Sequence, residues 1–115
     1  MMWLLFNSGF LSIVSDRNST ENLLVRARVR GHIQEVFPSA KVFTDSNADY
    51  LFRTVIIRDE VAAAVADSIR HIDYDNFKNS VASQSLHDAY LDVWRTMRHL
   101  QDTMSQTKAV PLRRV

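Results

Sequence analysis

The amino-acid sequence predicts an α+β fold: a two-layer sandwich in which helices lie on one face of an antiparallel or mixed sheet of about five strands. Two observations predict this class. Residues Tyr50–Ile57 have the alternating pattern of a strand and run directly into a helix that begins with Asp59 and Glu60, where negative charge stabilises a helix N-terminus. The second observation is the order of the predicted elements, β-β-β-α-β-β-α-α. Its nearest common relative is a ferredoxin-like core, although this chain ends in a long helix where that fold ends in a strand.

Three strands are predicted before the first helix. The apolar runs Met2–Phe6 and Phe10–Ser15 are separated by a short polar turn, and Gly9 in this turn can adopt positive φ, so the two runs should form a hairpin. The third strand covers Leu23–Arg28, with Leu24 expected to face the core and Leu23 as a further candidate for the same face.

A short helix and a second hairpin follow. Val29–Phe37 has helical spacing and ends before Pro38, because the residue that precedes a proline avoids the helical region. Gly31 near its start is expected to weaken this helix by about 1 kcal/mol relative to alanine. Lys41–Thr44 and Tyr50–Ile57 then form strands joined by a polar turn.

Two longer helices complete the predicted fold. The second helix, from Asp59, should cover the sheet with one apolar face, formed by Val61, Val65, Ser68 or Ile69, and Ile72. The third helix, Gln84–Ser105, carries an apolar stripe with heptad spacing: Leu86, Tyr90, Val93, Met97, Leu100 and Met104. We expect this stripe to pack on the second helix or the sheet, with Trp94 buried. The alternative is a coiled-coil seam, and hence a homodimer through the third helix.

The composition indicates one domain over residues 1–107, followed by a flexible basic tail over residues 108–115. The chain has 115 residues, of which 46% are hydrophobic, and no cysteine, which excludes disulfides and thiolate chemistry. Its formal net charge of +1 makes nucleic acid an unlikely main partner. No apolar run approaches the roughly 20 residues that span a bilayer. We therefore expect a cytoplasmic protein without a membrane partner.

No motif indicates catalysis or a cofactor. The chain lacks the serine elbow and the glycine-rich phosphate loops, and two glycines could not build the latter. His71, Asp73 and Asp75 could supply metal ligands, but the end of the second helix explains them better. His87 and Asp88 could be half of an acid–base pair, although adjacent helical positions point about 100° apart. We expect no catalytic residue, no metal and no cofactor.

Two groups of residues are candidates for binding a partner. Arg26 and Arg28 should project from one face of the third strand, away from Val25 and Ala27, and Arg30 extends this arginine row toward the following helix. Such a row could bind phosphates or an acidic protein surface. The alternative is a solvated sheet face paired with acidic residues from neighbouring strands.

The second group lies in a polar connection between helices. Tyr74, Phe77 and Lys78 bring two aromatic rings and a positive charge into this segment. Aromatic residues in a connection usually fix it to the core, but exposed ones act as anchors at protein interfaces.

Short blocks along the chain resemble a family of small uncharacterised proteins of bacteria and their phages. The blocks are Met2-Trp3-Leu4-Leu5-Phe6-Asn7, Gly9-Phe10 with Ser12, Val25-Arg26-Ala27-Arg28, Ala48-Asp49-Tyr50 with Phe52-Arg53, Ile72-Asp73-Tyr74 with Asn76-Phe77-Lys78, and Tyr90 with Val93-Trp94. The resemblance covers most of Met2 to Leu100. It implies kinship, and no known activity or catalytic residue can be carried onto these positions.

These observations favour a non-catalytic protein-binding module. A small domain similar to phage proteins would suit an inhibitor of a host defence complex, such as a CRISPR effector. The alternative hypothesis is a small enzyme or ligand-binding protein with a pocket near Arg53, His71 and Tyr74.

Overall fold

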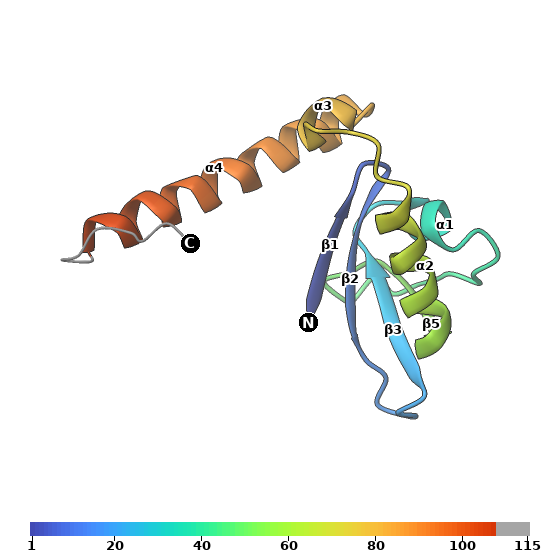
Figure 1. Cartoon of the computed structure of the whole chain (residues 1–115). Helices are drawn as coiled ribbons and strands as arrows, with labels where there is room; N and C mark the ends of the chain where they lie inside the picture. Colours follow the sequence, from blue (N-terminus) through green and yellow to red (C-terminus); the bar gives the residue numbers. More distant parts are fainter. Residues whose placement is uncertain (108–115) are drawn as a thin grey trace.

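The structure is a computed structural model that describes residues 1–107; the tail predicted over residues 108–115 lies outside the described residues. Its elements follow the predicted order, with one short helix in addition (Figure 1). They are β1 (Met2–Phe6), β2 (Gly9–Ser15), β3 (Asn22–Ala27), α1 (His32–Val36), β4 (Phe43–Thr44), β5 (Phe52–Ile57), α2 (Arg58–Arg70), α3 (Phe77–Ser80) and α4 (Gln84–Thr107).

The five strands form one sheet in the order β1-β2-β3-β5-β4, and all four neighbouring pairs are antiparallel. The predicted α+β class is therefore confirmed, with the antiparallel form of the sheet. Its likeness to a ferredoxin-like core is limited to the layer that α1 and α2 form on this sheet. β4 is only two residues long, so the second hairpin is much shorter than the first.

One face of the sheet carries the core, and α1 and α2 cover it. Successive side chains of a strand point to opposite faces, and in β3 Leu23, Val25 and Ala27 lie on the core face. The expectation for Leu24 is wrong, because this residue shares the opposite, open face with Arg26. The buried core residues are Leu11, Ile13, Val25, Ala27, Ile33, Phe37, Phe52, Ile56 and Val61.

The helix α1 is shorter than predicted because it begins after Gly31. This glycine has φ of 91°, the left-handed conformation that only glycine adopts without strain, so the chain turns there and does not continue as a helix. Val29 consequently lies outside α1 and is exposed, whereas Ile33 is buried in the core.

The helix α2 follows β5 without a loop and covers the sheet with its first half only. Val61 is buried and Val65 packs against the core. The predicted apolar face does not extend further, since Ile69 is exposed and Ile72 lies beyond the C-terminal end of α2 and is exposed as well.

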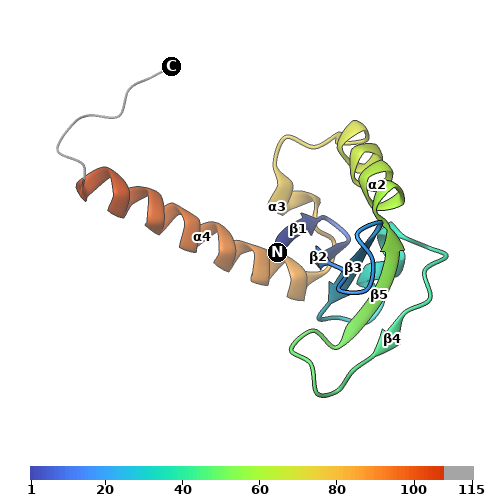
Figure 2. The same cartoon turned by 90° about the horizontal axis from the view of Figure 1, so that it is seen from below.

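The helix α4 leaves the two layers and projects away from the sheet (Figure 2). Only its first turns contact the domain, on the side of the sheet opposite α2, and the molecule is consequently elongated, with extents of 49 × 32 × 32 Å. The expectation that the whole stripe packs on the second helix or the sheet is therefore wrong.

Candidate functional site

Tyr90 joins α4 to the body of the protein by hydrogen bonds. The Tyr90 hydroxyl points at the turn of the first hairpin, where the carbonyl oxygens of Phe6 and Gly9 accept from it at 2.9 and 2.8 Å. The Tyr90 side chain is only 4% exposed, and burial raises the pKa of its phenol well above 10.0. The ring of Phe77 lies 5.4 Å from that of Tyr90, so α3 is held at the same place.

Beyond Tyr90 the apolar stripe of α4 is uncovered. We call this surface the α4 stripe; it consists of Val93, Trp94, Met97, Leu100 and Met104, all of them exposed large hydrophobic side chains. Trp94 is 47% exposed, which contradicts the expectation that it is buried and holds the helix to the core. The heptad spacing of the stripe therefore does not bury these residues in the domain, and each side chain stays at least 38% exposed within the described part of the chain.

The charged residues of α4 lie on the other side of the helix and pair with one another. Arg95 lies 3.6 Å from Asp92, and Arg98 donates to Asp102 at 3.3 Å. These pairs are one turn apart on the helix surface, where each contributes a few tenths of a kcal/mol. The α4 stripe is thus apolar on one side of a helix that carries two ion pairs on the other.

The short helix α3 extends this surface and brings in two of the predicted binding residues. The Lys78 ammonium lies 4.2 Å from the centre of the Trp94 ring, and Phe77 lines a groove with Trp94 and Met97. Tyr74 contacts Phe77, with ring centres 5.6 Å apart. The aromatic connection and the α4 stripe therefore form one continuous surface.

The helix α3 itself was not predicted from the sequence, because a four-residue helix is too short to show a periodic pattern. The signal that could have found it is Asn76, whose side chain accepts from the Asn79 backbone N–H at 3.3 Å and caps the helix.

Within residues 1–107, the arginine row lies against aromatic rings and forms none of the pairs with acidic residues of neighbouring strands that the alternative prediction required. Arg26 and Arg28 both lie over the ring of Tyr50, at 4.3 and 4.1 Å from its centre. Tyr50 is 2% exposed and its hydroxyl accepts from the Trp3 indole N–H at 3.0 Å. Among the described residues, neither arginine has an acidic partner. Both side chains therefore hold Tyr50 in place, and reversing their charges would disturb the fold as well as any binding.

The neighbours of Tyr50 shift the pKa of its phenol. Burial opposes ionisation of its phenol, but the Ser12 hydroxyl, the Trp3 N–H and the Arg28 charge outweigh burial, so that the Tyr50 pKa is lowered. Arg30 is separate from this group and lies 5.1 Å from the ring centre of Phe52. The row of three arginines is consequently split between two aromatic residues.

The proposed enzyme pocket does not form. His71 and Tyr74 line a hollow with Phe6 and Ala64 on the helix-covered side of the domain, whereas Arg53 lies on the open face of the sheet and lines another hollow. The His71 ring contacts the Asp67 carbonyl oxygen at 2.8 Å, as expected for a helix end. Within residues 1–107, no group of three His, Cys, Asp or Glu could hold a metal ion.

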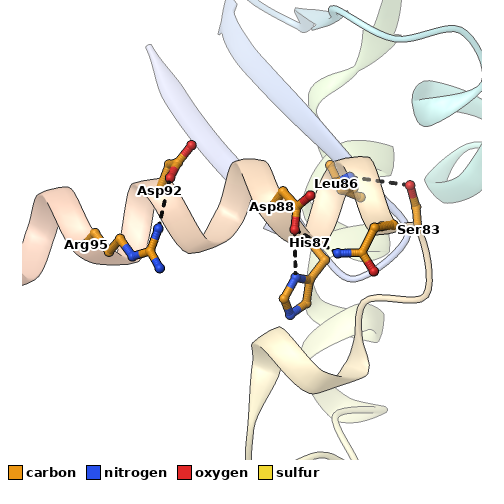
Figure 3. A network of polar contacts seen from close by, with 7 residues as sticks. Ser83, Leu86, His87, Asp88, Asp92 and Arg95 are labelled. Atoms are coloured by element: carbon orange, nitrogen blue, oxygen red, sulfur yellow. Dashed lines mark hydrogen bonds and ion pairs between the residues drawn. The ribbon is translucent and has the colours of Figure 1, made fainter.

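The pair His87–Asp88 belongs to a polar network at the start of α4 (Figure 3). Although adjacent, the two side chains meet at 3.4 Å, and Gln84 also donates to Asp88 at 2.8 Å. Ser83 accepts from the Leu86 backbone N–H at 3.4 Å and so caps the helix. Because the Ser83 hydroxyl oxygen accepts from the backbone, we interpret this network as the N-terminal cap of α4.

No family model matches this chain, and neither the curated proteins nor the solved structures compared with it give a match. Among the described residues, no helix combines the length and the apolar character needed to cross a bilayer.

Proposed function

We propose that this chain is a non-catalytic protein-binding module that docks through the α4 stripe. The observation that supports the proposal most is that five large apolar side chains remain exposed on a helix that projects from the domain. Large exposed apolar patches are rare on monomers and mark interaction surfaces. An inhibitor that docks on a host defence complex would be one such module.

The occupant that we propose for the stripe is a second copy of this chain. In the heptad of α4, the further positions that flank the stripe are His87, Ala89, Thr96, Gln101 and Thr103, none of which is a lysine, arginine, aspartate or glutamate. In coiled coils these flanking positions select partners by charge. A partner with a charged seam would leave its charges uncompensated there, whereas a second α4 stripe matches this neutral surface.

An antiparallel pair of α4 helices would cover the largest part of each stripe. The residues from Val93 to Met104 span about 18 Å of helix. In an antiparallel pair, the end of one stripe near Met104 approaches the start of the other, where Trp3 is 51% exposed and lies beside Val93. Each stripe would then continue onto the partner's domain.

The area available fits a weak dimer. The exposed parts of Trp3 and the α4 stripe amount to roughly 600 Å² per chain when full side-chain areas of about 160–250 Å² are used. The pair would bury about 1,200 Å², the lower limit of stable specific interfaces. Interfaces at this lower limit are typical of weak, transient complexes, so we expect association in the micromolar range.

Sedimentation velocity over the micromolar range tests self-association. We expect the wild-type chain to shift from monomer to dimer, Met97→Glu to remain monomeric, and His99→Glu, which adds the same residue on the charged side of α4, to associate like the wild type. Because Met97 is exposed, its substitution should change the stability of the monomer by less than about 0.5 kcal/mol.

A monomeric wild type would refute the second copy as occupant. Acrylamide quenching of the two tryptophans, Trp3 and Trp94, then separates the remaining outcomes. Accessible indoles would leave the stripe open for another protein, to be sought by capture from a native host lysate with Met97→Glu as the control bait. Shielded indoles in a monomer would mean that the chain covers its own stripe, and the docking proposal would fail.

A further inference from the structure

The open face of the sheet holds two arginines opposite each other without a counter-charge. Arg26 of β3 and Arg53 of β5 are direct cross-strand partners, so their side chains leave the sheet on the same face about 5 Å apart at Cβ. Like charges in this position destabilise a sheet. Neither guanidinium forms an ion pair with a carboxylate anywhere in residues 1–107.

The contacts that these arginines do make are neutral and incomplete. One Arg26 nitrogen donates to the Ser12 hydroxyl at 2.8 Å and lies 3.8 Å from the Met1 sulfur, and the guanidinium lies over the Tyr50 ring. Its Nε is buried without a hydrogen-bond partner, so the other terminal nitrogen is the one left for a ligand. Within residues 1–107, Arg53 donates only to the Tyr50 carbonyl oxygen, at 3.5 Å, the outer limit of such a bond. Each guanidinium therefore has donors left for a further acceptor, and the pair has an uncompensated charge.

The open face of the sheet contains a hollow that is lined by these positively charged side chains. Arg17, Arg26 and Arg53 line it together with apolar residues that include the exposed ring of Phe43. Asp16 is the single carboxylate of the lining, and its oxygen accepts from the Asn18 backbone N–H at 3.3 Å. Three positive side chains against one negative side chain give the hollow a net positive charge.

We propose that this hollow binds a phosphate group, held by Arg26 and Arg53. The planar fork of an arginine matches phosphate oxygens with two parallel hydrogen bonds. A phosphate near neutral pH carries close to two negative charges, which would offset both guanidiniums, whereas a single carboxylate would offset one. This site is independent of α4, since none of its lining residues belongs to the α4 stripe.

Thermal melts in added anions test the site. Inorganic phosphate at pH 7.5 should raise the melting temperature of the wild-type chain by about 5 °C over chloride of equal ionic strength, if the phosphate concentration is roughly ten times the dissociation constant. Acetate should raise it far less. Arg53→Gln should remove the phosphate shift yet melt in chloride at the same or a higher temperature than the wild type, because it relieves the repulsion with Arg26.

Controls separate a bound dianion from a general charge effect. Lys41→Gln removes one positive charge from another part of the surface and should keep the phosphate shift, while Arg53→Lys, which keeps the charge without the fork, should retain only part of it. Lowering the pH to 5.5 converts most inorganic phosphate to its monoanion, so its shift should shrink, while that of sulfate, which remains a dianion, persists.

Equal shifts with adenosine monophosphate and inorganic phosphate would identify the phosphate group alone as the ligand; a larger shift with the nucleotide would support a phosphorylated small molecule whose ring contacts Phe43. The proposal is overturned if Arg53→Gln keeps the phosphate shift, if acetate equals phosphate, or if chloride of the same ionic strength produces the whole effect.

Discussion

Replacing Tyr90 by phenylalanine tests whether one hydroxyl fixes α4 to the domain. Tyr90→Phe keeps the buried ring and its contact with Phe77, and removes only the oxygen that donates to the Phe6 and Gly9 carbonyls. The substitution therefore creates no cavity of note. Its effect on stability reports the hydrogen bonds at the turn of the first hairpin.

The expected loss of unfolding free energy is about 1–2 kcal/mol. A net contribution of about 1 kcal/mol is usual for one hydrogen bond, and a further penalty arises because carbonyl oxygens in this buried place lose a donor. Two acceptors share the single proton of Tyr90, so the loss stays below that of two separate bonds. For a domain of about 100 residues, 1 kcal/mol lowers the melting temperature by roughly 4–8 °C.

Urea unfolding followed by far-UV circular dichroism and tryptophan fluorescence measures this loss. Tyr74→Phe is the matched control, since the Tyr74 hydroxyl makes no hydrogen bond within residues 1–107 and its removal should change stability by less than about 0.5 kcal/mol. Equal, small losses in both variants would refute the anchoring role of Tyr90.

The pH dependence gives a second measure of the same anchor. Because the folded pKa of Tyr90 is raised above 10.0, the contribution of its neutral phenol is complete below pH 10 and is lost as the pH rises further. Tyr90→Phe should remove that alkaline loss. A wild-type stability that does not fall more steeply above pH 10 than that of the variant would contradict the burial of this hydroxyl.

Three further substitutions have defined outcomes. Trp94→Ala should lower the unfolding free energy of the monomer by less than about 1.5 kcal/mol in urea melts, because the ring is half exposed. A buried indole would cost about 3–5 kcal/mol, so a loss above about 3 kcal/mol would mean that α4 packs on its own domain. Gly31→Ala should cost about 1–2 kcal/mol through φ alone, since a Cβ there meets nothing within 4 Å; an unchanged melt would argue against the left-handed turn. His32 accepts from the Phe10 N–H at 3.1 Å, and burial lowers the pKa of its imidazole below 6.5. The stability of the wild type should therefore fall as the pH drops below 6.5, and that of His32→Gln should fall less. Equal pH dependence of the two unfolding free energies would contradict this role of His32.

Local sequence patterns determined most of the secondary structure. The turn of the first hairpin and the continuous passage from β5 into α2 are encoded by neighbouring residues, so their positions were predicted to within a few residues. The expectation of positive φ at Gly9 is wrong, because this residue already belongs to β2. The orientation of Arg26 away from Val25 was also predictable, because side chains alternate along a strand. Leu24 was misplaced because Leu23 and Leu24 are both apolar, and only the register with β5 decides which of them faces the core.

The candidate binding surfaces depended on contacts between distant residues. Nothing local to Tyr50 indicates that Trp3 donates to its hydroxyl or that Arg26 lies over its ring, since these residues come from different strands and a loop. The opposition of Arg26 and Arg53 likewise follows from strand register. Sequence separation of this kind leaves no periodic signal.

The heptad stripe of α4 shows most clearly where the sequence stops being sufficient. Its spacing determined that one side of the helix is apolar, but the same spacing serves an intramolecular core and an intermolecular seam equally well. Only the tertiary structure showed that most of the stripe does not serve an intramolecular core, because Tyr90 attaches the first turns of α4 to the hairpin, the helix then runs away from the sheet, and Met97 and Leu100 remain exposed. Periodicity specifies which side of a helix avoids water, whereas the direction of the helix specifies what that side can reach.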